Sequence, residues 1–505
     1  MRNACLVLFY FSFLPHLSWS QLFPTDSAIV NYRIIGFTFP ATAKADNYKV
    51  EICSGDYTGK DFDQHISNTL KSKSNRIIGK VPAFNQAYSW RVIAYQNSKE
   101  LVSGKVHHFS TGTTSFIDTT ANRMSVLHKA DIFKDGYVFA DATRALYNMN
   151  GEPVWYLPHI EGVKSDSATV RDLKLSCKGT ITLMLEGDVY EIDYNGKVLW
   201  RGPNGRKIKT DTLQGYHHEI TRLANGHYLT LGFDPIPKRP VPINRDSIMR
   251  IRQADTSKNK IARIQLRKPR YGVLMEYDDK ENLVWKWEAA KYFGSIDLSA
   301  YPESAQNDVH ENSFYFDEQN SIIYLSFRNL SQILKISYPS GKVLSTYSGT
   351  LPSPGDNASN LFCGQHAIRH SEHGYLYMFD NGCNPTEAPK VIRCKEPAKD
   401  SAQLSETWEF PCPVATHDVH TSRTKQPATS GGNAIELPDQ SMFISTCIPN
   451  SNIYIVSMTK QILWEAAIEK LNLASHTWQY VPLYRASIIT ESDKLDDLIW
   501  NSQNH

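Results

Sequence analysis

The chain has 505 residues, with 54 Lys and Arg against 52 Asp and Glu, which gives a formal net charge of +2. Hydrophobic residues make up 41% and charged residues 21%, a composition typical of globular proteins and not of disordered ones. The balanced charge argues against a nucleic-acid-binding surface, and the length predicts more than one domain.

The first twenty residues are typical of a secretory signal peptide. Arg2 precedes the apolar run "CLVLFYFSFL", and "SWS" places small residues before Gln21. The run is too short to cross a bilayer, which favours a cleaved signal over a membrane anchor. We therefore expect residues 1–20 to be removed and the mature chain, from about Gln21, to be periplasmic or secreted without a membrane span.

The number and spacing of the cysteines bear on disulfides and on metal binding. Export permits disulfides, and Cys5 would leave with the signal, so an odd number of the eight cysteines would remain. No CxxC motif is present, and a structural zinc site is therefore not predicted.

Residues 21–115 are predicted to form a small β-sandwich domain. Short alternating strands are separated by turn residues in "YRIIGFTFP" (32–40), "NYKVEICSG" (47–55), "AYSWRVIAYQ" (87–96) and "GKVHHFSTG" (104–112). "YSWRVIAY" followed by "FSTG" resembles the fibronectin type III pattern. Domains of this kind are usually spacers or binding modules.

Residues 116–505 repeat one unit, a hairpin whose second strand ends in Trp or a substitute for it. The clearest copies are "LYNMNGEPVWYLP" (146–158), "VYEIDYNGKVLWRG" (189–202) and "VLMEYDDKENLVWKWE" (273–288). Looser copies are "ILKISYPSGKVLSTYSG" (333–349), "VIRCKEPAKDSAQLSETWEF" (391–410) and "IYIVSMTKQILWEA" (453–466). Each copy follows another strand pair, so about four strands per repeat and six copies predict an all-β, six-bladed β-propeller. An irregular array of β-sandwiches is the alternative.

Polar residues recur where the inner strand of a predicted blade begins. They are His218 in "GYHHEITRLANGHYLTLG", His310, Asn312 and Arg328 in "DVHENSFYFDEQNSIIYLSFRN", His366 in "GQHAIRHSEHGYLYMFDNG", and Thr429 and Ser430 in "PATSGGNAIELPDQSMFIS". The three histidines precede their strand turns by comparable distances. We therefore expect them to occupy equivalent positions and to face one mouth of the central channel.

Two kinds of site fit these residue types. The three histidines are a possible metal ligand set, but they have no carboxylate companion and Arg328 would repel a dication. The alternative is a site for a tetrahedral oxyanion, in which Arg328 supplies a bidentate fork and neutral side chains donate hydrogen bonds. In that site one neutral histidine attacks, and the others donate protons.

The combination of "HHEI…LANGHYLTLG", "HENS" with "SFRN", and "QHAI…GYLYMFDNG" resembles bacterial arylsulfate sulfotransferases. The resemblance implies an exported chain with a small β-sandwich and a six-bladed propeller, and the oligomer that it suggests is a homodimer. It also implies ping-pong transfer of a sulfuryl group from an aryl sulfate to a phenol through a sulfohistidine. Neither a cofactor, nor a metal, nor a nucleotide sulfate donor is expected.

The same resemblance assigns roles to individual residues. His366 matches the nucleophile, His218 and His310 match catalytic histidines, and Arg328 matches the sulfate-binding arginine. Glu219 stands where the family has an aspartate after the histidine. The expected substrate-binding residues are Asn312, either Thr429 or Ser430, and Tyr484 of "YVPLYRAS".

A disulfide close to the nucleophile in some relatives implies that Cys363 and Cys383 are a candidate pair, although their spacing differs from the family pattern. A different class of function also fits an exported propeller with a fibronectin-like domain. Such a chain would be a non-catalytic adhesin or a glycan-binding protein. Release of p-nitrophenol from its sulfate ester distinguishes these alternatives from the transferase.

Overall fold

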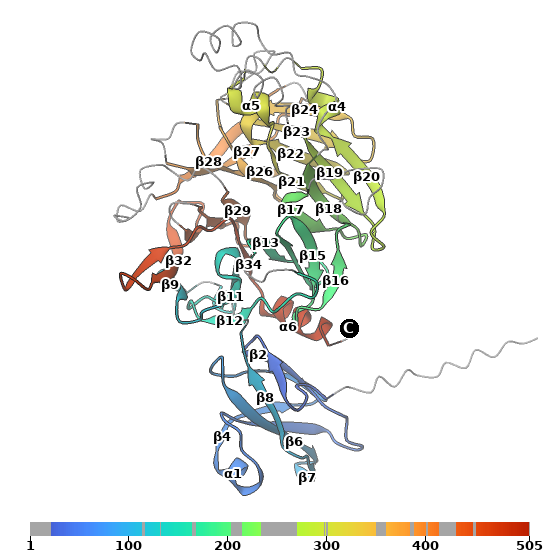
Figure 1. Ribbon diagram of the computed structural model, residues 1–505, viewed down its shortest axis with the longest axis vertical. Helices are drawn as coiled ribbons and strands as arrows, with labels where there is room; N and C mark the ends of the chain where they lie inside the picture. Colours follow the sequence, from blue (N-terminus) through green and yellow to red (C-terminus); the bar gives the residue numbers. More distant parts are fainter. Residues whose placement is uncertain are drawn as a thin grey trace, which may run out of the picture. The chain divides into compact units, whose positions relative to one another are not determined.

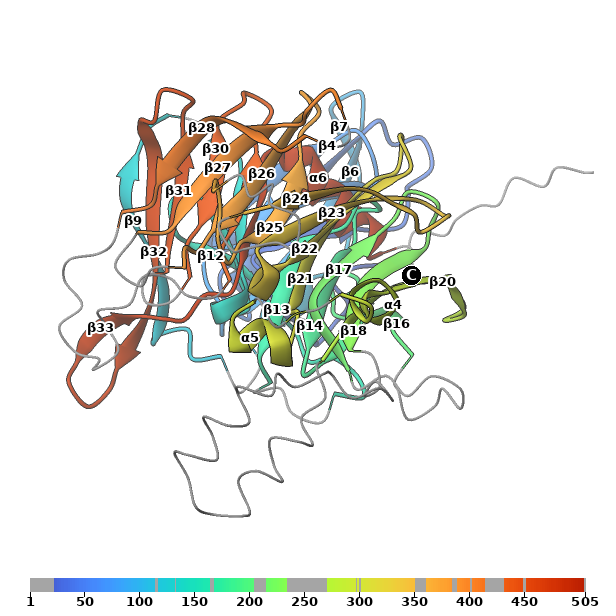
Figure 2. The ribbon, with the colours of Figure 1, turned by 90° about the horizontal axis from the view of Figure 1, so that it is seen from above.

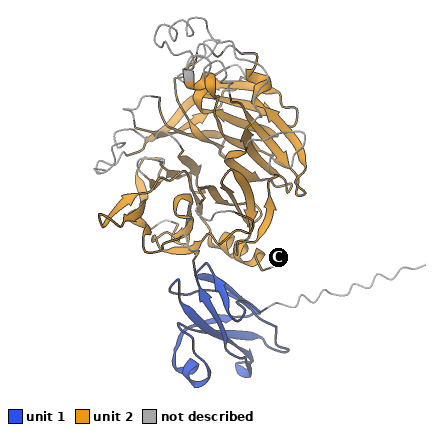
Figure 3. Ribbon diagram, in the orientation of Figure 1, with its two compact units in different colours: residues 1–112 blue, residues 113–505 orange. Residues whose placement is uncertain are grey.

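The computed structural model describes residues 22–503, except 114–116, 132, 164–167, 204–214, 234–269, 297, 299–300, 350–359, 384–387, 400–401, 414–430 and 448–450. The predicted signal peptide and the candidates Thr429 and Ser430 lie outside the described residues. The chain divides into two compact units, residues 1–112 and 113–505 (Figure 3).

Unit 1 contains a six-stranded and a two-stranded sheet. The larger consists of β1 (Ala28–Val30), β3 (Asn47–Cys53), β4 (Ile66–Ser72), β6 (Ala87–Gln96), β7 (Lys99–Ser103) and β8 (His107–Thr111), and the smaller of β2 (Ile34–Thr38) and β5 (Arg76–Lys80). A short helix, α1 (Gly59–Gln64), precedes β4. Phe37 of the smaller sheet packs on Trp90 of the larger, with ring centroids 5.0 Å apart. The two sheets therefore enclose one apolar core.

Unit 2 is nearly all β, and five of its described sheets have four antiparallel strands each. The first contains β10 (Tyr137–Ala140), β11 (Ala145–Asn148), β12 (Pro153–Tyr156) and β34 (Ala486–Ile489). The second contains β13 (Val170–Leu175), β14 (Ile181–Leu185), β15 (Asp188–Ile192) and β16 (Val198–Arg201). The third contains β17 (Tyr216–Arg222), β18 (Tyr228–Phe233), β19 (Gly272–Tyr277) and β20 (Leu283–Glu288).

The chain continues with the same pattern. The fourth sheet contains β21 (Glu311–Asp317), β22 (Ile322–Phe327), β23 (Gln332–Ser337) and β24 (Val343–Ser348). The fifth contains β25 (His366–His370), β26 (Tyr375–Asp380), β27 (Lys390–Lys395) and β28 (Ser405–Pro411). A six-stranded sheet follows, with β29 (Asn433–Glu436), β30 (Met442–Ser445), β31 (Asn452–Val456), β32 (Ile462–Asn472), β33 (Thr477–Tyr480) and β9 (Asn122–Lys129).

Helical segments in the described part of unit 2 are short. They are η1 (Asp141–Thr143), α4 (Ala289–Phe293), α5 (Glu303–Asn307), η3 (Arg328–Leu330) and α6 (Ser492–Asn501). No helix among the described residues has the length and apolar character needed to cross a bilayer. This β-rich architecture, with its many four-stranded sheets, agrees with the propeller-like fold expected from the repeats.

The repeated hairpins predicted from the sequence are antiparallel strand pairs in the structure. They are β11–β12, β15–β16, β19–β20, β23–β24, β27–β28 and β31–β32. In the second to fifth sheets each of these pairs forms the outer half of the sheet, because the preceding pair supplies the inner strands. The inner strands β13, β17, β21, β25 and β29 contact one another in succession, and β34 contacts β13.

Both ends of unit 2 pair with strands from the opposite end of its sequence. β34 pairs with β10 in the first sheet, although more than three hundred residues separate them, and so it becomes the inner strand there. β9 pairs along β32 in the last sheet, and the two strands lie side by side in Figures 1 and 2. Asn433 of β29 also donates to the carbonyl oxygen of Ala486 at 2.9 Å, which links the last sheet to the first.

Buried carboxylates join neighbouring sheets through tyrosine hydroxyls. Tyr338 donates to Glu276 at 2.7 Å across the third and fourth sheets. Tyr324 and Tyr347 both donate to Glu396 at 2.6 Å across the fourth and fifth. These contacts satisfy polar groups that would otherwise be buried without a partner.

Candidate functional site

Three histidines from three sheets meet at one point. His218 lies in β17, His310 directly precedes β21, and His366 begins β25. One ring nitrogen of each lies within 4.8 Å of the others. The rings of His218 and His310 are nearly perpendicular, with centroids 5.1 Å apart. The structure therefore brings together the three histidines that the sequence singled out.

The three histidines do not occupy equivalent ladder positions, and the sequence-based expectation that they do was wrong. His366 pairs with Phe379 immediately before a β-bulge, which is the position of His217 and not of His218 in β17. His218 lies inside the bulge of its own strand, and His310 lies ahead of the strand.

Local backbone geometry compensates for these different offsets. His218 and His310 have positive φ angles of 66° and 57°, and Ala367 next to His366 has 51°. Left-handed backbone is uncommon for residues other than glycine, and a bulge redirects the side chains beside it. The convergence of the rings therefore depends on strained loops and bulges, and not on a simple repeat.

The ring of His366 is oriented by hydrogen bonding at one of its two nitrogens, Nδ1. Its Nδ1 bonds the side-chain oxygen of Asn381 and lies 3.3 Å from the carbonyl oxygen of Gly364. An oxygen acceptor at Nδ1 favours the tautomer that carries the proton there, which leaves the Nε2 lone pair unprotonated. Burial, followed by the charges of Arg328 and His310, holds the pKa of His366 well below its usual range. The ring is therefore neutral at neutral pH.

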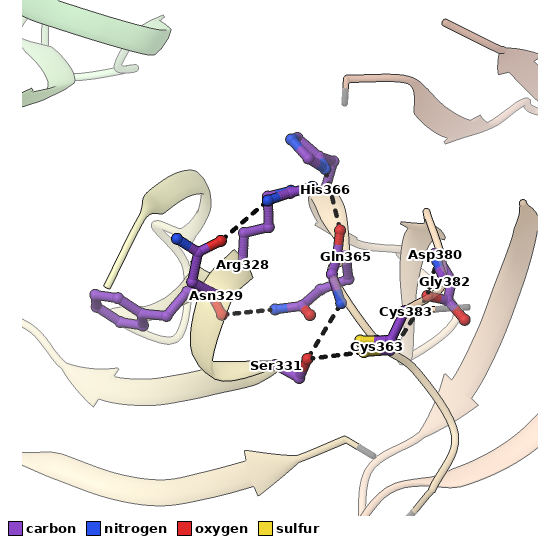
Figure 4. The surroundings of a disulfide bond; sticks show 11 residues. Arg328, Asn329, Ser331, Cys363, Gln365, His366, Asp380, Gly382 and Cys383 are labelled. Carbon is purple, nitrogen blue, oxygen red and sulfur yellow. Dashed lines mark hydrogen bonds between the residues drawn. A yellow bond between two sulfur atoms is a disulfide. The ribbon is translucent and has the colours of Figure 1, made fainter. Parts of the chain in front are cut away.

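Arg328 extends toward the same space as His366 (Figure 4). Its backbone N–H donates to the carbonyl oxygen of His310 at 2.9 Å, and its Nη1 donates to the Asn329 side chain at 3.0 Å. Asn329 in turn donates to the carbonyl oxygen of Asp308 at 2.8 Å. Burial is the main cause that lowers the pKa of Arg328 from its usual value. A desolvated guanidinium favours an anionic ligand.

Asn312 contacts the backbone beside His366. Its Nδ2 donates to the carbonyl oxygen of Gln365 at 2.7 Å, while its Oδ1 is buried without a hydrogen-bond partner. Gln365 is itself fixed, because its Nε2 donates to Ser326 at 3.0 Å and to the carbonyl oxygen of Gln332 at 3.1 Å. Asn312 therefore anchors the segment that carries His366.

His217 supports His218 from within the protein. The two Nδ1 atoms lie 2.6 Å apart, so one ring donates to the other. Burial lowers the pKa of His217 to about 3, and burial followed by the charges of neighbouring histidines lowers the pKa of His218 well below its usual range. Both rings are therefore neutral. The sequence analysis did not assign a role to His217, although the "HH" doublet was an available signal.

Tyr484 lies beside this group, as expected from the sequence. Its ring centroid is 6.1 Å from that of His218, and its hydroxyl is buried without a hydrogen-bond partner. Burial raises the pKa of Tyr484 to about 12, so the hydroxyl keeps its proton and is a donor. Thr429 and Ser430 lie outside the described residues and have no structural placement.

A disulfide joins Cys363 to Cys383 next to the nucleophile candidate, which confirms the pairing implied by the family resemblance (Figure 4). The backbone N–H groups of Cys363 and Gly382 donate to Asp380 at 2.9 and 3.0 Å. Cys363 and Asp380 therefore tie the entry of β25 to the end of β26, where Asn381 contacts His366.

Several residues of the site were missed from the sequence. Asn381 and Asp380 lie in "FDNG", a motif that alone is too common to indicate a site. Arg485 also lies near the histidines, since its charge contributes to the lowered pKa of both His218 and His366. The only signal for Arg485 was its place next to Tyr484.

The geometry is compatible with two chemistries. Three convergent imidazoles are a possible ligand set for a transition metal. The guanidinium of Arg328, however, places a positive charge where it would oppose a dication. Neutral imidazoles, an uncharged tyrosine hydroxyl and a desolvated guanidinium together fit a tetrahedral anion better.

Comparison with known proteins identifies one matching family model. The model described as "Arylsulfotransferase (ASST)" matches residues 125–402, which include His218, His310, Arg328 and His366. No curated protein matches the chain.

Several solved structures are similar at low TM-score. A protein of unknown function from Bacteroides caccae has a TM-score of 0.39 and 10% identity, over 74% of this chain and 100% of that chain. The periplasmic gluconolactonase PpgL from Pseudomonas aeruginosa has a TM-score of 0.30 and 9% identity, over 88% of this chain and 99% of that chain. At these values, neither similarity carries an argument about function.

Proposed function

The chain belongs to the arylsulfotransferase family, whose model matches more than half of its length, and we propose that it transfers a sulfuryl group from a phenolic sulfate ester to a phenolic acceptor. A covalent sulfohistidine at His366 links the two half-reactions. The single observation that carries this proposal is the meeting of three histidines from three sheets beside Arg328.

In the first half-reaction, Arg328 binds the sulfate of the donor. The neutral Nε2 of His366 attacks sulfur, an N–S bond forms, and the bond from sulfur to the phenolic oxygen breaks. A phenol has a pKa of about 10, so its departure is assisted when His218 or His310, in its protonated imidazolium form, gives the leaving oxygen a proton. Binding of the anionic sulfate favours that protonated form. The products are a free phenol and a sulfuryl group on His366.

In the second half-reaction, an acceptor phenol occupies the place of the first. The histidine that donated its proton now accepts one from the acceptor hydroxyl. The acceptor oxygen attacks sulfur, the N–S bond breaks, and His366 returns to its neutral form. One subsite serves both steps, which is typical of ping-pong kinetics.

In this scheme, Arg328, Asn312 and Tyr484 donate hydrogen bonds to the sulfuryl oxygens, on which charge develops. Donors fixed before the reaction stabilise the transition state more than the ground state, because they need no reorganisation. Asn381 helps by keeping the Nδ1 proton on His366, so that the attacking lone pair stays on Nε2. Thr429 or Ser430 is proposed to contribute a further hydroxyl.

We propose three further features of this enzyme. The six sheets of unit 2 are blades of a six-bladed propeller, unit 1 is a fibronectin type III-like domain, and the chain is exported. The propeller is supported by the successive contacts between inner strands and by the pairing of β34 with β10 and of β9 with β32, which joins the two ends of unit 2. The common core of the two sheets in unit 1 supports the second.

The test uses p-nitrophenyl sulfate as donor, with and without phenol as acceptor. We expect steady release of p-nitrophenol that depends on phenol, and a sulfuryl adduct on His366, detected by mass spectrometry after brief exposure to the donor alone. Release that does not depend on acceptor would indicate a sulfatase. No release at all would favour an adhesin or a glycan-binding protein.

The convergence of three imidazoles also supports a metal-dependent hydrolase as a second candidate. The same assay after prolonged treatment with a chelator separates the two. The transferase should retain its full rate, whereas a metal-dependent hydrolase should lose activity and recover it on addition of the metal.

A further inference from the structure

Arg485 connects three inner strands from three different sheets. Its side chain is 4% exposed. Nη1 lies 3.0 Å from Asp172 of β13 and 3.2 Å from Glu219 of β17. Nη2 donates to the carbonyl oxygen of Asn312 of β21 at 3.3 Å. One guanidinium therefore holds β13, β17 and β21 together with its own segment ahead of β34.

Each of these contacts lies next to a residue of the histidine site. Glu219 follows His218 directly, and Asn312 holds the backbone beside His366. Arg485 itself follows Tyr484. A shift of the guanidinium would thus be transmitted to three groups of the site at once.

The backbone at Arg485 is fixed as firmly as its side chain. The buried carboxylate of Asp141 accepts the N–H of Arg485 at 2.9 Å and that of Tyr484 at 3.2 Å. The two carboxylates that pair with Arg485 each have a second cationic partner. Glu219 pairs with Arg369 at 2.6 Å, and Asp172 pairs with Lys174 at 2.8 Å. The ionic cluster of Asp172, Glu219, Arg369, Lys174 and Arg485 lines a cavity of about 230 Å³ to which all six inner strands contribute.

Stability alone does not explain such a cluster. Removing charges from water costs several kcal/mol per ion, and well-packed apolar residues often replace a buried ion pair without loss of stability. A buried cluster that touches the site from three strands is better explained by a requirement for geometry.

We propose that Arg485 is a positioning residue for sulfuryl transfer. Its guanidinium packs beneath the histidine site and fixes the strands that carry His218 and Asn312 relative to the segment that carries Tyr484. This inference rests on the function proposed above. Arg485 touches neither the sulfur nor the phenol in this scheme. It acts through the residues it holds.

The charge of Arg485 has a second effect on the same site. After burial and other nearby charges, it contributes to the low pKa of His218 and of His366. The other titratable or charged groups around these two rings and the adjoining His217 are His217 itself, His310, Asp308, Arg270, Arg328, Tyr484 and Cys447. Two of them are permanent cations: Arg328, which lowers the pKa of His366, and Arg270, which acts on His217. Loss of Arg485 should therefore make both rings easier to protonate.

The experiment compares Arg485→Lys and Arg485→Gln with Arg369→Gln as the matched control. Arg369 pairs with the same Glu219, but its other hydrogen bonds go to the carbonyl oxygens of Phe314 and Ile368, and it is not among the main causes of the lowered pKa of either histidine. The first measurement is titration of the histidine ring signals by NMR in the absence of substrate. The second is kcat and KM for p-nitrophenyl sulfate with phenol.

We expect Arg485→Lys to keep the low titration midpoints, because the charge remains, and to lower kcat by on the order of tenfold to a hundredfold with little change in KM. Arg485→Gln should raise the midpoints of His218 and His366 and move the acidic limb of kcat to higher pH. Arg369→Gln should leave the midpoints where they are. If Arg485→Gln does not fold, Arg485→Lys alone decides.

The inference is overturned if Arg485→Lys has the kcat of the parent, or if Arg485→Gln folds with unchanged histidine titration. These outcomes differ from failure of the proposed function. In that case the parent itself releases no p-nitrophenol, while the NMR titration still shows whether Arg485 controls the protonation of the histidines.

Discussion

Three polar atoms at the mouth of the inner strands differ from two carboxylates in the layer between neighbouring sheets in whether the protein satisfies them. Between the sheets, Glu276 and Glu396 each accept at least one tyrosine hydroxyl at 2.6 to 2.7 Å. At the mouth, the Nε2 of His217, the Oδ1 of Asn312 and the hydroxyl of Tyr484 are buried without a hydrogen-bond partner.

This difference separates groups that stabilise the fold from groups that serve a ligand. A buried polar atom without a partner costs about 1–3 kcal/mol. Such costs persist at functional sites. Of these three atoms, the Tyr484 hydroxyl is a donor, and the oxygens of a bound sulfate ester would satisfy it. Glu276 and Glu396, between the sheets, have no such role, and both accept hydrogen bonds from within the protein.

The sharpest test of this comparison is His366→Asn at the mouth. We expect transfer to fall below detection, because no other side chain replaces the Nε2 nucleophile, while the melting temperature stays near that of the parent. Donor-dependent p-nitrophenol release and circular dichroism measure the two effects. His373→Gln is the control, since His373 pairs with Glu436 at 2.6 Å away from the site. Turnover within tenfold of the parent would reject His366 as the nucleophile.

Arg328→Ala should have the next largest effect on activity. The desolvated guanidinium is proposed to bind the sulfuryl oxygens, so its removal should lower kcat/KM by a hundredfold or more, which corresponds to roughly 3 kcal/mol of transition-state binding. Steady-state kinetics with p-nitrophenyl sulfate measure the loss. An unchanged kcat/KM would show that another group binds the sulfate.

Glu396→Gln tests the layer between the sheets, where we expect an effect on stability and none on activity. The amide cannot accept from both Tyr324 and Tyr347 and also pair with Lys335, which lies 3.0 Å from Glu396. We expect a loss of about 2 kcal/mol in the free energy of unfolding, with kcat unchanged. Urea unfolding and the transfer assay distinguish this result. A fall in kcat without loss of stability would contradict the assignment of this layer to folding.

A smaller effect concerns the pH dependence of stability. The pKa of His217 is about 3 in the folded protein and near 6.5 in the unfolded chain. Between these values only the unfolded state binds the proton, so stability falls as pH falls from about 6.5 toward 3. His217→Asn should remove this contribution, about 1.4 kcal/mol per pH unit in that window.

The measurement compares the free energies of unfolding of the parent and His217→Asn at several pH values between 7 and 4. Asp141 acts in the opposite sense, because burial raises its pKa to about 7, but it is present in both proteins and cancels in the difference. Parallel pH profiles for the two proteins would mean that His217 is not held neutral by the fold.

Much of the fold was predictable because the repeated hairpins are local. "VYEIDYNGKVLWRG" carries its alternation and its Asn-Gly turn within fourteen residues, and it forms β15 and β16 as expected. The pairing of β34 with β10 and of β9 with β32 was not predictable. Each pairing joins segments from opposite ends of unit 2, and neither β34 nor β9 has a distinctive sequence pattern.

The site was predictable in its histidines and less so in what holds them. The family motifs pointed to His218, His310 and His366, and the three rings do meet. Their different ladder positions were not visible, because bulges and left-handed residues leave no periodic signal. Arg485 and Asp172 are 313 residues apart, and no short motif could have linked them.

The pairing of β34 with β10 has a consequence for the order in which the site can form. Tyr484 and Arg485 lie directly ahead of β34, so their positions depend on this strand joining the first sheet. A folding intermediate in which β34 is still unpaired would hold the three histidines without Tyr484 and Arg485. Reactivity toward sulfate esters would thus appear only after β34 has closed the first sheet.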